Sequence, residues 1–345
     1  NSFVRRFRLD ADGRRRFTLI NQRTDFHRWR DLDSKVTLHR HIETYRQRNG
    51  GASFPWWPDT FVMPADFDAL QAAHRERPGR WIVKQASLFG AHGMHIVDSP
   101  EDVPLGDDWI VQRYIDDPLL VRARKTSIRL YLAVTSSKPL RVWLYRDALV
   151  RFAPLPYQPD RPDELASHLA NLKIFENRPD LIEGLVGAIE ADRPIWTLDR
   201  MLTELAANGK DARRAGAGMR RLAIGFARLL RESRFLDGQN ANGLRHAYGP
   251  KIIGLDVMLD SSLQPWLMEM EYRPGTRTLM GMDNGRIARE LFQLSIFPLL
   301  NSQKDDPVGE SLLRDPEACA AKLGEGEWAR AVGFVPLLGD MRPGT

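Results

Sequence analysis

Three carboxylates on a predicted β-hairpin are the leading candidates for chemistry in this sequence. Within residues 251–272, alternation places Asp256 across from Glu269 on one face, with Glu271 one step further along. Carboxylates that face each other on a sheet repel, and a bound cation removes that conflict. Oxygen-only ligands suit Mg²⁺ carrying nucleotide phosphates, so we predict a magnesium site here. The alternative is a solvent-exposed hairpin on which the acids are incidental.

This pairing depends on where the hairpin closes. We expect the turn to run from Asp260 to Pro265, so that Leu259 lies opposite Trp266. In that register Leu267 shares the face of the two glutamates.

A second candidate strand carries cations on one face. Alternation over residues 124–134 places Lys125, Ser127, Arg129 and Tyr131 on one side and apolar side chains on the other. Arginine binds phosphate oxygens in bidentate fashion, so this face suits a cleft that handles phosphates. A polar, solvated strand face explains the same pattern equally well.

A third candidate is Lys84, at the end of the apolar strand Trp81–Lys84. The loop that follows, residues 87–93, contains Gly90 and Gly93, and backbone N–H groups in such a loop can hold phosphates. The sequence contains neither a Walker A motif nor G-x-G-x-x-G. His92 and His95 are given no role, because such histidines are more often surface or packing residues.

The elements around these residues predict an α+β fold with antiparallel hairpins flanked by helices. We expect Asp66 to cap a helix that extends to Arg77. The strands are predicted at residues 81–84, 94–97, 109–114, 124–136, 140–152, 251–259 and 266–272, and the helices at 26–32, 36–48, 66–77, 162–190, 198–207, 219–231 and 287–300.

Composition narrows the classes of protein. The 345 residues suit two or three lobes, and no apolar run approaches the length that spans a bilayer. Cys319 is the single cysteine, which excludes an intrachain disulfide and favours a reducing, cytoplasmic setting. The formal charge of +5 suits an acidic partner. We expect no nucleic-acid partner, because the basic residues look scattered along the chain.

Taken together in their order, these segments resemble the tubulin tyrosine ligase-like family of ATP-grasp ligases. The resemblance covers about residues 21–280 and is carried by WIVK at 81–84, WIVQRYIDDPLL at 109–120, RKTSIRLY at 124–131, LYRDALVRF at 144–152, HLAN at 168–171, and DVMLD at 256–260 with PWLME at 265–269. It implies an ATP-grasp fold that holds the nucleotide between two lobes.

The resemblance implies a role for each matching position. Arg129 and Arg146 would face the reacting carboxylate and phosphate, and Mg²⁺ would bind to Asp256, Glu269 and Glu271. The implied ATP-binding residues are Lys84 and Lys125 at the phosphates, Gln112, Arg113, Tyr114 and Ile115 at the adenine, and Asn171 near the nucleotide. The sequence departs from the family pattern at Ser127, where the family has an acid, at Ala170, where it has Thr, and at Glu271, where it has Asn.

The resemblance implies a cytoplasmic carboxylate–amine ligase that uses ATP and Mg²⁺ and forms an acyl phosphate. We expect it to add an amino acid, glutamate by preference, to an acidic protein or peptide acceptor. The Arg-rich composition suggests a bacterial source. The alternatives are another ATP-dependent transfer, by a kinase or an adenylyltransferase, and a non-catalytic ATP-binding module. The expected lobes are residues 1–63, 64–118 and 119–300, followed by a tail at 301–345.

Overall fold

The computed structural model describes residues 32–86, 93–137, 140–171, 174, 178–191, 194–232, 248–272, 274 and 334–338. Every structural statement below concerns these residues. Several predictions therefore lie outside the described part: the helices at 26–32 (all but Leu32) and 287–300, most of the loop at 87–93, and Cys319.

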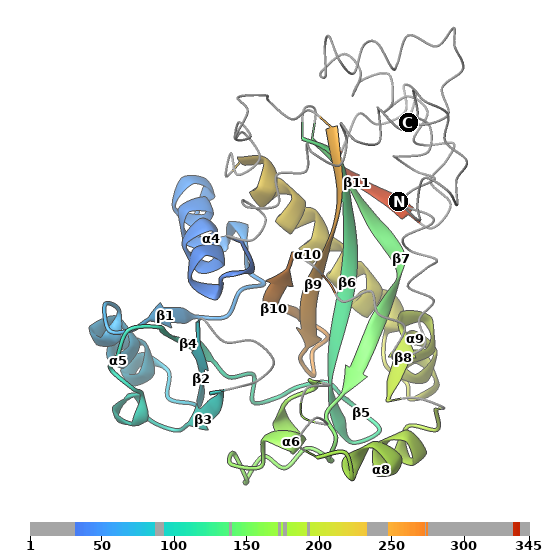
Figure 1. Cartoon of the computed structure of the whole chain (residues 1–345), viewed down its shortest axis with the longest axis horizontal. Coiled ribbons are helices and arrows are strands. Elements are labelled where there is room, and N and C mark those ends of the chain that lie inside the picture. Colours follow the sequence, from blue (N-terminus) through green and yellow to red (C-terminus); the bar gives the residue numbers. More distant parts are fainter. Residues whose placement is uncertain are drawn as a thin grey trace, which may run out of the picture.

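A four-stranded antiparallel sheet forms the smaller lobe (Figure 1). Its strand order is β1 (Thr60–Val62), β4 (Trp109–Arg113), β2 (Trp81–Gln85) and β3 (His95–Val97). Helix α5 (Phe67–Glu76) and the 3₁₀ helix η2 (Pro100–Asp102) pack beside it, and Trp81, Val83 and Leu70 share its apolar core. Because side chains alternate along β2, Ile82 and Lys84 lie on the opposite face from Trp81 and Val83.

A seven-stranded antiparallel sheet forms the larger lobe. Its main path is β10 (Pro265–Glu271), β9 (Tyr248–Leu259), β6 (Arg124–Ser137), β7 (Leu140–Phe152) and β11 (Phe334–Leu338). The short strands β5 (Leu120–Val121) and β8 (Ile195–Thr197) pair with β6 and β7. The long β6–β7 hairpin therefore forms the centre of this lobe, as the alternating patterns predicted.

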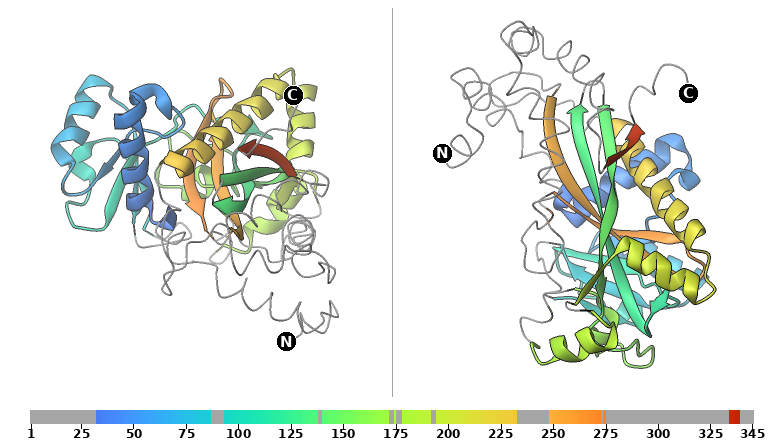
Figure 2. Two further views of the ribbon diagram at one scale, coloured as in Figure 1. Left: turned by 90° about the horizontal axis from the view of Figure 1, so that it is seen from above. Right: turned by 90° about the vertical axis from the view of Figure 1, so that its right-hand side faces the viewer.

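Helices cover one face of the larger sheet (Figure 2). The long helix α10 (Ala212–Glu232) and α9 (Leu198–Ala207) pack there, and Leu222 and Phe226 of α10 join Leu130 and Leu132 of β6 in one core. Two short helices, α6 (Leu165–His168) and α8 (Leu181–Ala188), lie in the region where sequence patterns predicted helix from 162 to 190. That prediction was too long, because Pro162 and Pro179 interrupt the region.

The N-terminal described segment packs on the larger lobe. Helix α4 (Lys35–Asn49) and the 3₁₀ helix η1 (Gly51–Ser53) lead into Phe54, which is part of the same core as α10. The N–H of Leu267 donates to the carbonyl of Trp56 at 2.7 Å. A Cβ built on Gly225 would meet the Trp56 ring at 2.2 Å, so this crossing requires a glycine. The expected lobe boundaries stay a prediction.

Two local predictions need correction. The carboxylate of Asp66 does not cap α5; its Oδ2 instead accepts the N–H of Val62 at 2.8 Å and closes the turn before the helix. The tail at 301–345, in which the sequence showed no signal, contributes β11 to the edge of the larger sheet beside β7. No helix in the described residues is long and apolar enough to cross a membrane.

Candidate active site

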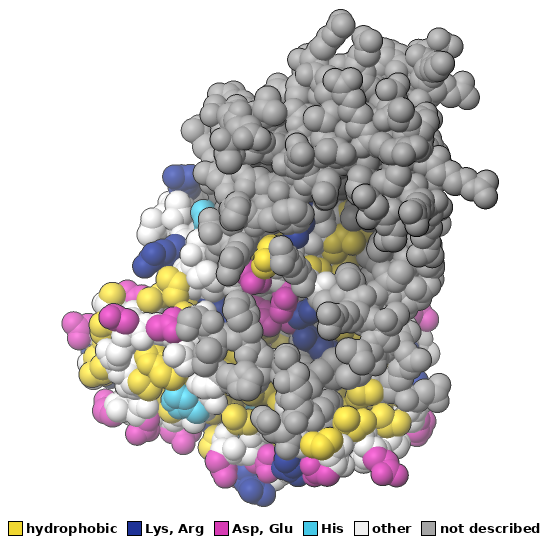
Figure 3. All heavy atoms as spheres, viewed as in Figure 1, with side chains coloured by type: hydrophobic (Ala, Val, Ile, Leu, Met, Phe, Trp, Pro, Cys, Tyr) yellow, Lys and Arg dark blue, Asp and Glu magenta, His cyan; other side chains and the backbone are white. Residues whose placement is uncertain are grey.

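A pocket opens between the two sheets, on the face of the larger sheet opposite α10. Its empty volume, which includes space open to solvent, is about 780 Å³. On the face drawn in Figure 3, acidic and basic side chains lie side by side between the two lobes. The pocket is lined by Ile82, Lys84, Met94, Arg113, Tyr114, Ile115, Lys125, Thr126, Ser127, Arg151, His168, Leu169, Ala170, Asn171, Asp256, Met258, Met268 and Glu269.

The β9–β10 hairpin brings the three predicted carboxylates together. Oxygen atoms of Asp256, Glu269 and Glu271 lie within 4.8 Å of one another, and we call these three residues the carboxylate cluster. Asp256 pairs with Glu269, as predicted, and Glu271 pairs with Gly254. The hairpin thus places the acids on the pocket side of the larger sheet.

A β-bulge produces this pairing. The hairpin closes with Pro265 opposite Leu259, one residue away from the predicted register. The register shifts between Leu267 and Glu269, so Met268 is an extra residue on β10. Consequently Leu267 lies in the apolar core and not on the face of the glutamates, which corrects the expected alternation.

Two arginines hold Asp256. Arg129 on β6 binds it in bidentate fashion, with Nε–Oδ1 at 2.7 Å and Nη2–Oδ2 at 2.8 Å. Arg151 on β7 places Nη2 at 2.6 Å from Oδ2. Burial would raise the pKa of Asp256, but the charges of Arg129 and Arg151 outweigh it and hold the pKa far below its ordinary value. Asp256 is therefore a fixed anion.

The glutamates of the carboxylate cluster behave differently. Burial raises the pKa of Glu269, and the negative charge of Asp256 raises it further. Burial also raises the pKa of Glu271, although Arg129 opposes this through a contact of 3.2 Å. The cluster thus contains one acid that is paired with arginines and two acids whose negative charge is disfavoured. Added positive charge would relieve the repulsion among them.

Lys84 reaches the pocket from the smaller sheet. Its Nζ donates to Oε1 of Gln112 on the neighbouring strand β4 at 2.8 Å, and Gln112 Nε2 donates to Thr60 Oγ1 at 3.0 Å. Burial lowers the pKa of Lys84 to about 8, partly offset by the charge of Glu269. Gln112 thus orients the lysine without neutralising it.

Lys125 reaches the pocket from the larger sheet and lies among aromatic rings. Its Nζ donates to the Tyr114 hydroxyl at 2.8 Å and lies 4.1 Å from the centre of that ring and 5.3 Å from that of Tyr157. The Tyr114 hydroxyl is 2.6 Å from Nδ1 of His168. Burial lowers the pKa of Lys125 to about 7, so an anion in the pocket would favour its charged form.

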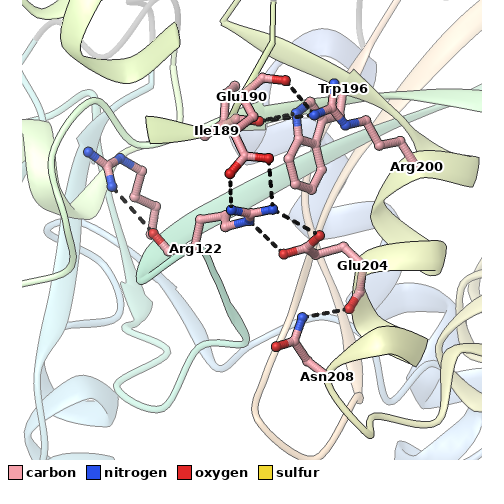
Figure 4. A network of polar contacts seen from close by, with 8 residues as sticks. Arg122, Ile189, Glu190, Trp196, Arg200, Glu204 and Asn208 are labelled. Carbon is pink, nitrogen blue, oxygen red and sulfur yellow. Dashed lines mark hydrogen bonds and ion pairs between the residues drawn. The ribbon is translucent and has the colours of Figure 1, made fainter. Parts of the chain in front are cut away.

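The turn before Lys125 is held by a network of ion pairs (Figure 4). Arg122 and Ala123 both have positive φ, 52° and 60°, a conformation that usually requires Gly or Asn. Arg122 contacts Glu190 beyond α8 at 2.8 Å and Glu204 on α9 at 2.6 Å. These contacts fix a backbone that is unfavourable by itself. The network therefore sets the start of β6, from which Lys125 extends.

The structure brings most of the predicted site residues to the pocket. Lys84, Arg113, Tyr114, Ile115, Lys125, Asn171, Asp256 and Glu269 all line it. Gln112 lies behind Lys84, and Arg129 and Glu271 lie beside Asp256. Arg146 is not brought there: its side chain is exposed on β7.

Among the pocket residues to which sequence reasoning assigned no role, two contact the predicted site residues. Arg151 is opposite Ser127 in the β6–β7 hairpin and donates to its Oγ at 2.8 Å. Pairing that hairpin from its turn, Ser137 with Leu140, would have put Arg151 opposite Thr126, because the register shifts twice between the turn and Arg151. The second is His168, whose ring contacts Tyr114 from a distant helix. No local pattern in the sequence indicates that contact.

Fold and pocket define the chain as an α+β protein with antiparallel sheets, consistent with the ATP-grasp class. Residues 14–297 match the Tubulin-tyrosine ligase family, and the chain belongs to that family. Members of this family are ligases that use ATP, generally with Mg²⁺, to add amino acids.

Three human relatives illustrate the range of similarity. Tubulin polyglutamylase TTLL5 is 28% identical over 251 residues, which are 72% of this chain and 20% of that protein. Tubulin monoglutamylase TTLL4 is 24% identical over 297 residues, 84% of this chain and 24% of that protein. Tubulin polyglutamylase TTLL13 is 32% identical over 228 residues, which are 64% of this chain and 28% of that protein.

The chain spans only about a fifth to a quarter of the length of the relatives TTLL5 and TTLL4. These relatives are human proteins, so the comparisons do not support the bacterial source that composition suggested.

Proposed function

We propose that this chain is an ATP-dependent ligase that joins glutamate to a carboxylate of an acidic protein acceptor. One observation carries the proposal: Asp256 and Glu269 of the carboxylate cluster and two buried lysines from different sheets border one pocket. Such a pocket offers an acidic wall for a cation and basic groups for phosphates. The names of the relatives, tubulin polyglutamylases and a monoglutamylase, favour glutamate as the donor.

The carboxylate cluster fits a magnesium ion in donor type and in charge. All its donors are carboxylate oxygens, and Glu269 and Glu271 are destabilised as anions where they stand. Asp256, Glu269 and Glu271 would hold the ion, which when bound neutralises charge on the phosphates of ATP. Glu271 stands where the family has Asn and adds one negative charge to the set.

The cations divide into two groups by their partners. Lys84 and Lys125 have neutral partners, Gln112 and Tyr114, so their charge is available to phosphate oxygens. Arg129 is committed to Asp256 and Glu271, and we assign it the positioning of the carboxylate cluster. Arg151 lines the pocket as well as contacting Asp256, which gives it access to a reacting carboxylate.

The proposed chemistry has two steps. An oxygen of the acceptor carboxylate attacks the γ-phosphorus of ATP, the bond to the β-phosphate oxygen breaks, and an acyl phosphate and ADP result. The amine of glutamate then attacks the acyl carbon, the bond to the phosphate oxygen breaks, and an amide, inorganic phosphate and a proton are released. The residues contribute by positioning the reactants and stabilising charge.

The remaining pocket residues support nucleotide binding. Arg113, Tyr114 and Ile115 connect the sheets at the pocket and would border the adenine, and Asn171 would lie near the nucleotide. Ser127, where the family has an acid, accepts a hydrogen bond from Arg151. The departure at Ser127 therefore leaves Arg151 directed at Asp256 alone among the acids of the pocket.

Mass spectrometry tests the proposal. An acidic peptide is incubated with the chain, Mg²⁺-ATP and a mixture of amino acids, and nucleotide products are followed in parallel. We expect a mass increment of one glutamate and equal amounts of ADP, both lost in Glu269→Gln. A phosphorylated peptide, or AMP with pyrophosphate, would identify a kinase or an adenylyltransferase instead. ATP binding without turnover under any condition would identify a binding module.

A further inference from the structure

Exposed arginines dominate the solvent-facing side of helix α10. Arginines occupy positions 213, 214, 220, 221, 228 and 231, and all six side chains are exposed. Their spacing follows the helical period, so they lie along one side of the helix. The row is about 27 Å long at the rise of an α-helix. We call these six residues the arginine stripe.

Helix α10 carries a large excess of positive charge for its length. Six arginines and one glutamate give α10 a net charge of +5. The formal net charge of the whole chain is also +5, so the remainder is balanced. The earlier view that basic residues are scattered along the chain therefore fails for α10.

The arginines at the start of the stripe do not stabilise their own helix. Arg213 and Arg214 lie in the first turn, where the helix dipole disfavours cations, and that turn contains no acidic residue. Asp211 caps the helix by accepting the N–H of Arg214 at 2.9 Å. Like charges spaced along one face repel. Arg231 lies in the last turn, where the helix dipole favours a cation, so the unfavourable part of the row is its first turn, which a partner explains better than folding does.

The arginine stripe lies on the far side of the larger sheet from the pocket. The apolar face of α10 packs on Ile128, Leu130 and Leu132, whereas Lys125 and Ser127 point into the pocket. Figure 2 shows α10 on the outside of the sheet. A partner on the stripe thus leaves the pocket open. A segment of about ten extended residues covers some 33–36 Å, which is longer than the stripe, so a docked acceptor can extend beyond it.

We propose that the arginine stripe docks an acidic segment of the protein acceptor, separate from the residue that is modified. This inference rests on the proposed function for the identity of the partner. Charge complementarity supports it, since guanidinium groups bind carboxylates in bidentate fashion. A docked acceptor holds its reactive carboxylate near the pocket at high effective concentration.

Peptide binding to the full chain tests the proposal. A fluorescent polyglutamate peptide is titrated with the protein at about 0.1 M ionic strength, where surface charges still act over some 10 Å. The test variant is Arg213→Gln, Arg221→Gln and Arg228→Gln together. The control variant is Arg40→Gln, Arg48→Gln and Arg75→Gln, three exposed arginines on α4 and α5. Both variants lose the same net charge.

We expect the test variant to bind at least about tenfold more weakly, a difference of about 1.4 kcal/mol, and the control within about twofold. Replacing the same three arginines with lysine should restore most of the affinity. Equal losses in test and control variants would overturn the proposal, because net charge alone would explain them. So would no loss, or binding of a single-stranded oligonucleotide through these arginines without binding of polyglutamate.

The stripe and the proposed function can fail separately. Glu269→Gln removes a pocket carboxylate and should leave peptide binding to the stripe unchanged. A chain that binds polyglutamate through α10 but shows no amide formation would contradict the ligase and preserve the docking surface. Amide formation with an affinity for acidic acceptors that does not depend on the arginine stripe would contradict the docking surface and preserve the ligase.

Discussion

The two sheets contribute different kinds of charge to the same pocket. The smaller sheet supplies Lys84, whose hydrogen-bond partner Gln112 is neutral. The larger sheet supplies Asp256, which two arginines hold as an anion, together with Glu269 and Glu271. One sheet thus presents a cation that responds to its surroundings, and the other a fixed charge network.

The two walls of the pocket respond differently to a ligand. A lysine with neutral partners changes its protonation when a phosphate approaches, whereas the ion pairs of Asp256 are already satisfied without ligand. Lys125 belongs to the larger sheet, but its partners are tyrosines, so it resembles Lys84 in this respect. The response of a side chain is therefore set by its contacts and not only by the sheet that carries it. Substitutions on the two walls should therefore have different effects on stability and on activity.

Asp256→Asn should have the largest effect. It leaves Arg129 and Arg151 buried without their shared anion, and breaking a buried ion pair in this way costs about 3–5 kcal/mol. We expect that loss in urea denaturation, together with loss of ATP turnover. A stable, active Asp256→Asn protein would contradict the view that Asp256 organises the larger sheet.

Glu269→Gln should separate function from stability. Burial and Asp256 already disfavour its negative charge, so removing that charge relieves repulsion. We expect turnover to fall at least about 100-fold, while the free energy of unfolding changes by less than about 1 kcal/mol. Denaturation and ADP release, measured on one preparation, provide the check. A large loss of stability would mean that Glu269 has a structural partner.

Arg151→Gln and Arg146→Gln form a matched pair on one strand. Arg151 lines the pocket and contacts Asp256, whereas Arg146 is exposed. We expect a loss of kcat of about 100-fold for Arg151→Gln, as for other groups that stabilise developing charge, and less than about twofold for Arg146→Gln. The opposite order would support the role that the family resemblance implied for Arg146.

Lys125→Met should change how stability depends on pH. The pKa of Lys125 is about 7 in the folded chain and ordinarily near 10.5, so between these values the unfolded state binds more protons. Stability from this group therefore rises with pH, by about 2 kcal/mol from pH 7 to pH 9. The wild type should show this rise relative to Lys125→Met in denaturant titrations. Parallel curves would contradict the buried, uncharged setting of Lys125.

Gly225→Ala and Gly216→Ala on α10 should change stability in opposite directions, without an effect on turnover. A Cβ at Gly225 collides with Trp56, whereas one at Gly216 meets Leu202 at an ordinary 3.9 Å. We expect Gly225→Ala to destabilise by about 1–3 kcal/mol and Gly216→Ala to stabilise by about 0.4–1 kcal/mol. Thermal melts would show both shifts. Equal shifts would mean that residues 54–57 do not pack on α10.

Much of the fold could be predicted because its strands alternate clearly. The apolar positions 128, 130, 132 and 134 define one face of β6, and that pattern also placed Lys125 correctly on the other face. The family resemblance added the roles of the nucleotide-binding residues. Boundaries were predicted less well where prolines interrupt a helix or where β11 joins the sheet from far along the chain.

The site was predicted in part, and the errors have physical causes. The predicted hairpin register differs by one residue from the observed register at the turn. The bulge at Met268 cancels this difference, so the predicted pairing of Asp256 with Glu269 is still correct. A bulge of this kind has no strong local signal, because any residue can occupy the extra position. Strand pairing brings Arg151 into the site, and His168 reaches it from a distant helix. The local spacing of residues shows neither of these long-range contacts.

An isotope experiment follows the oxygen atom that formation of the proposed acyl phosphate would transfer to phosphate. A polyglutamate peptide with ¹⁸O in its side-chain carboxylates is incubated with the chain, Mg²⁺-ATP and glutamate, and the released phosphate is analysed by mass spectrometry. Attack of the acceptor carboxylate on ATP predicts one ¹⁸O in inorganic phosphate for each amide formed. Amide formation with unlabelled phosphate, or release of AMP and pyrophosphate, would contradict the proposed acyl phosphate and with it this account of the pocket.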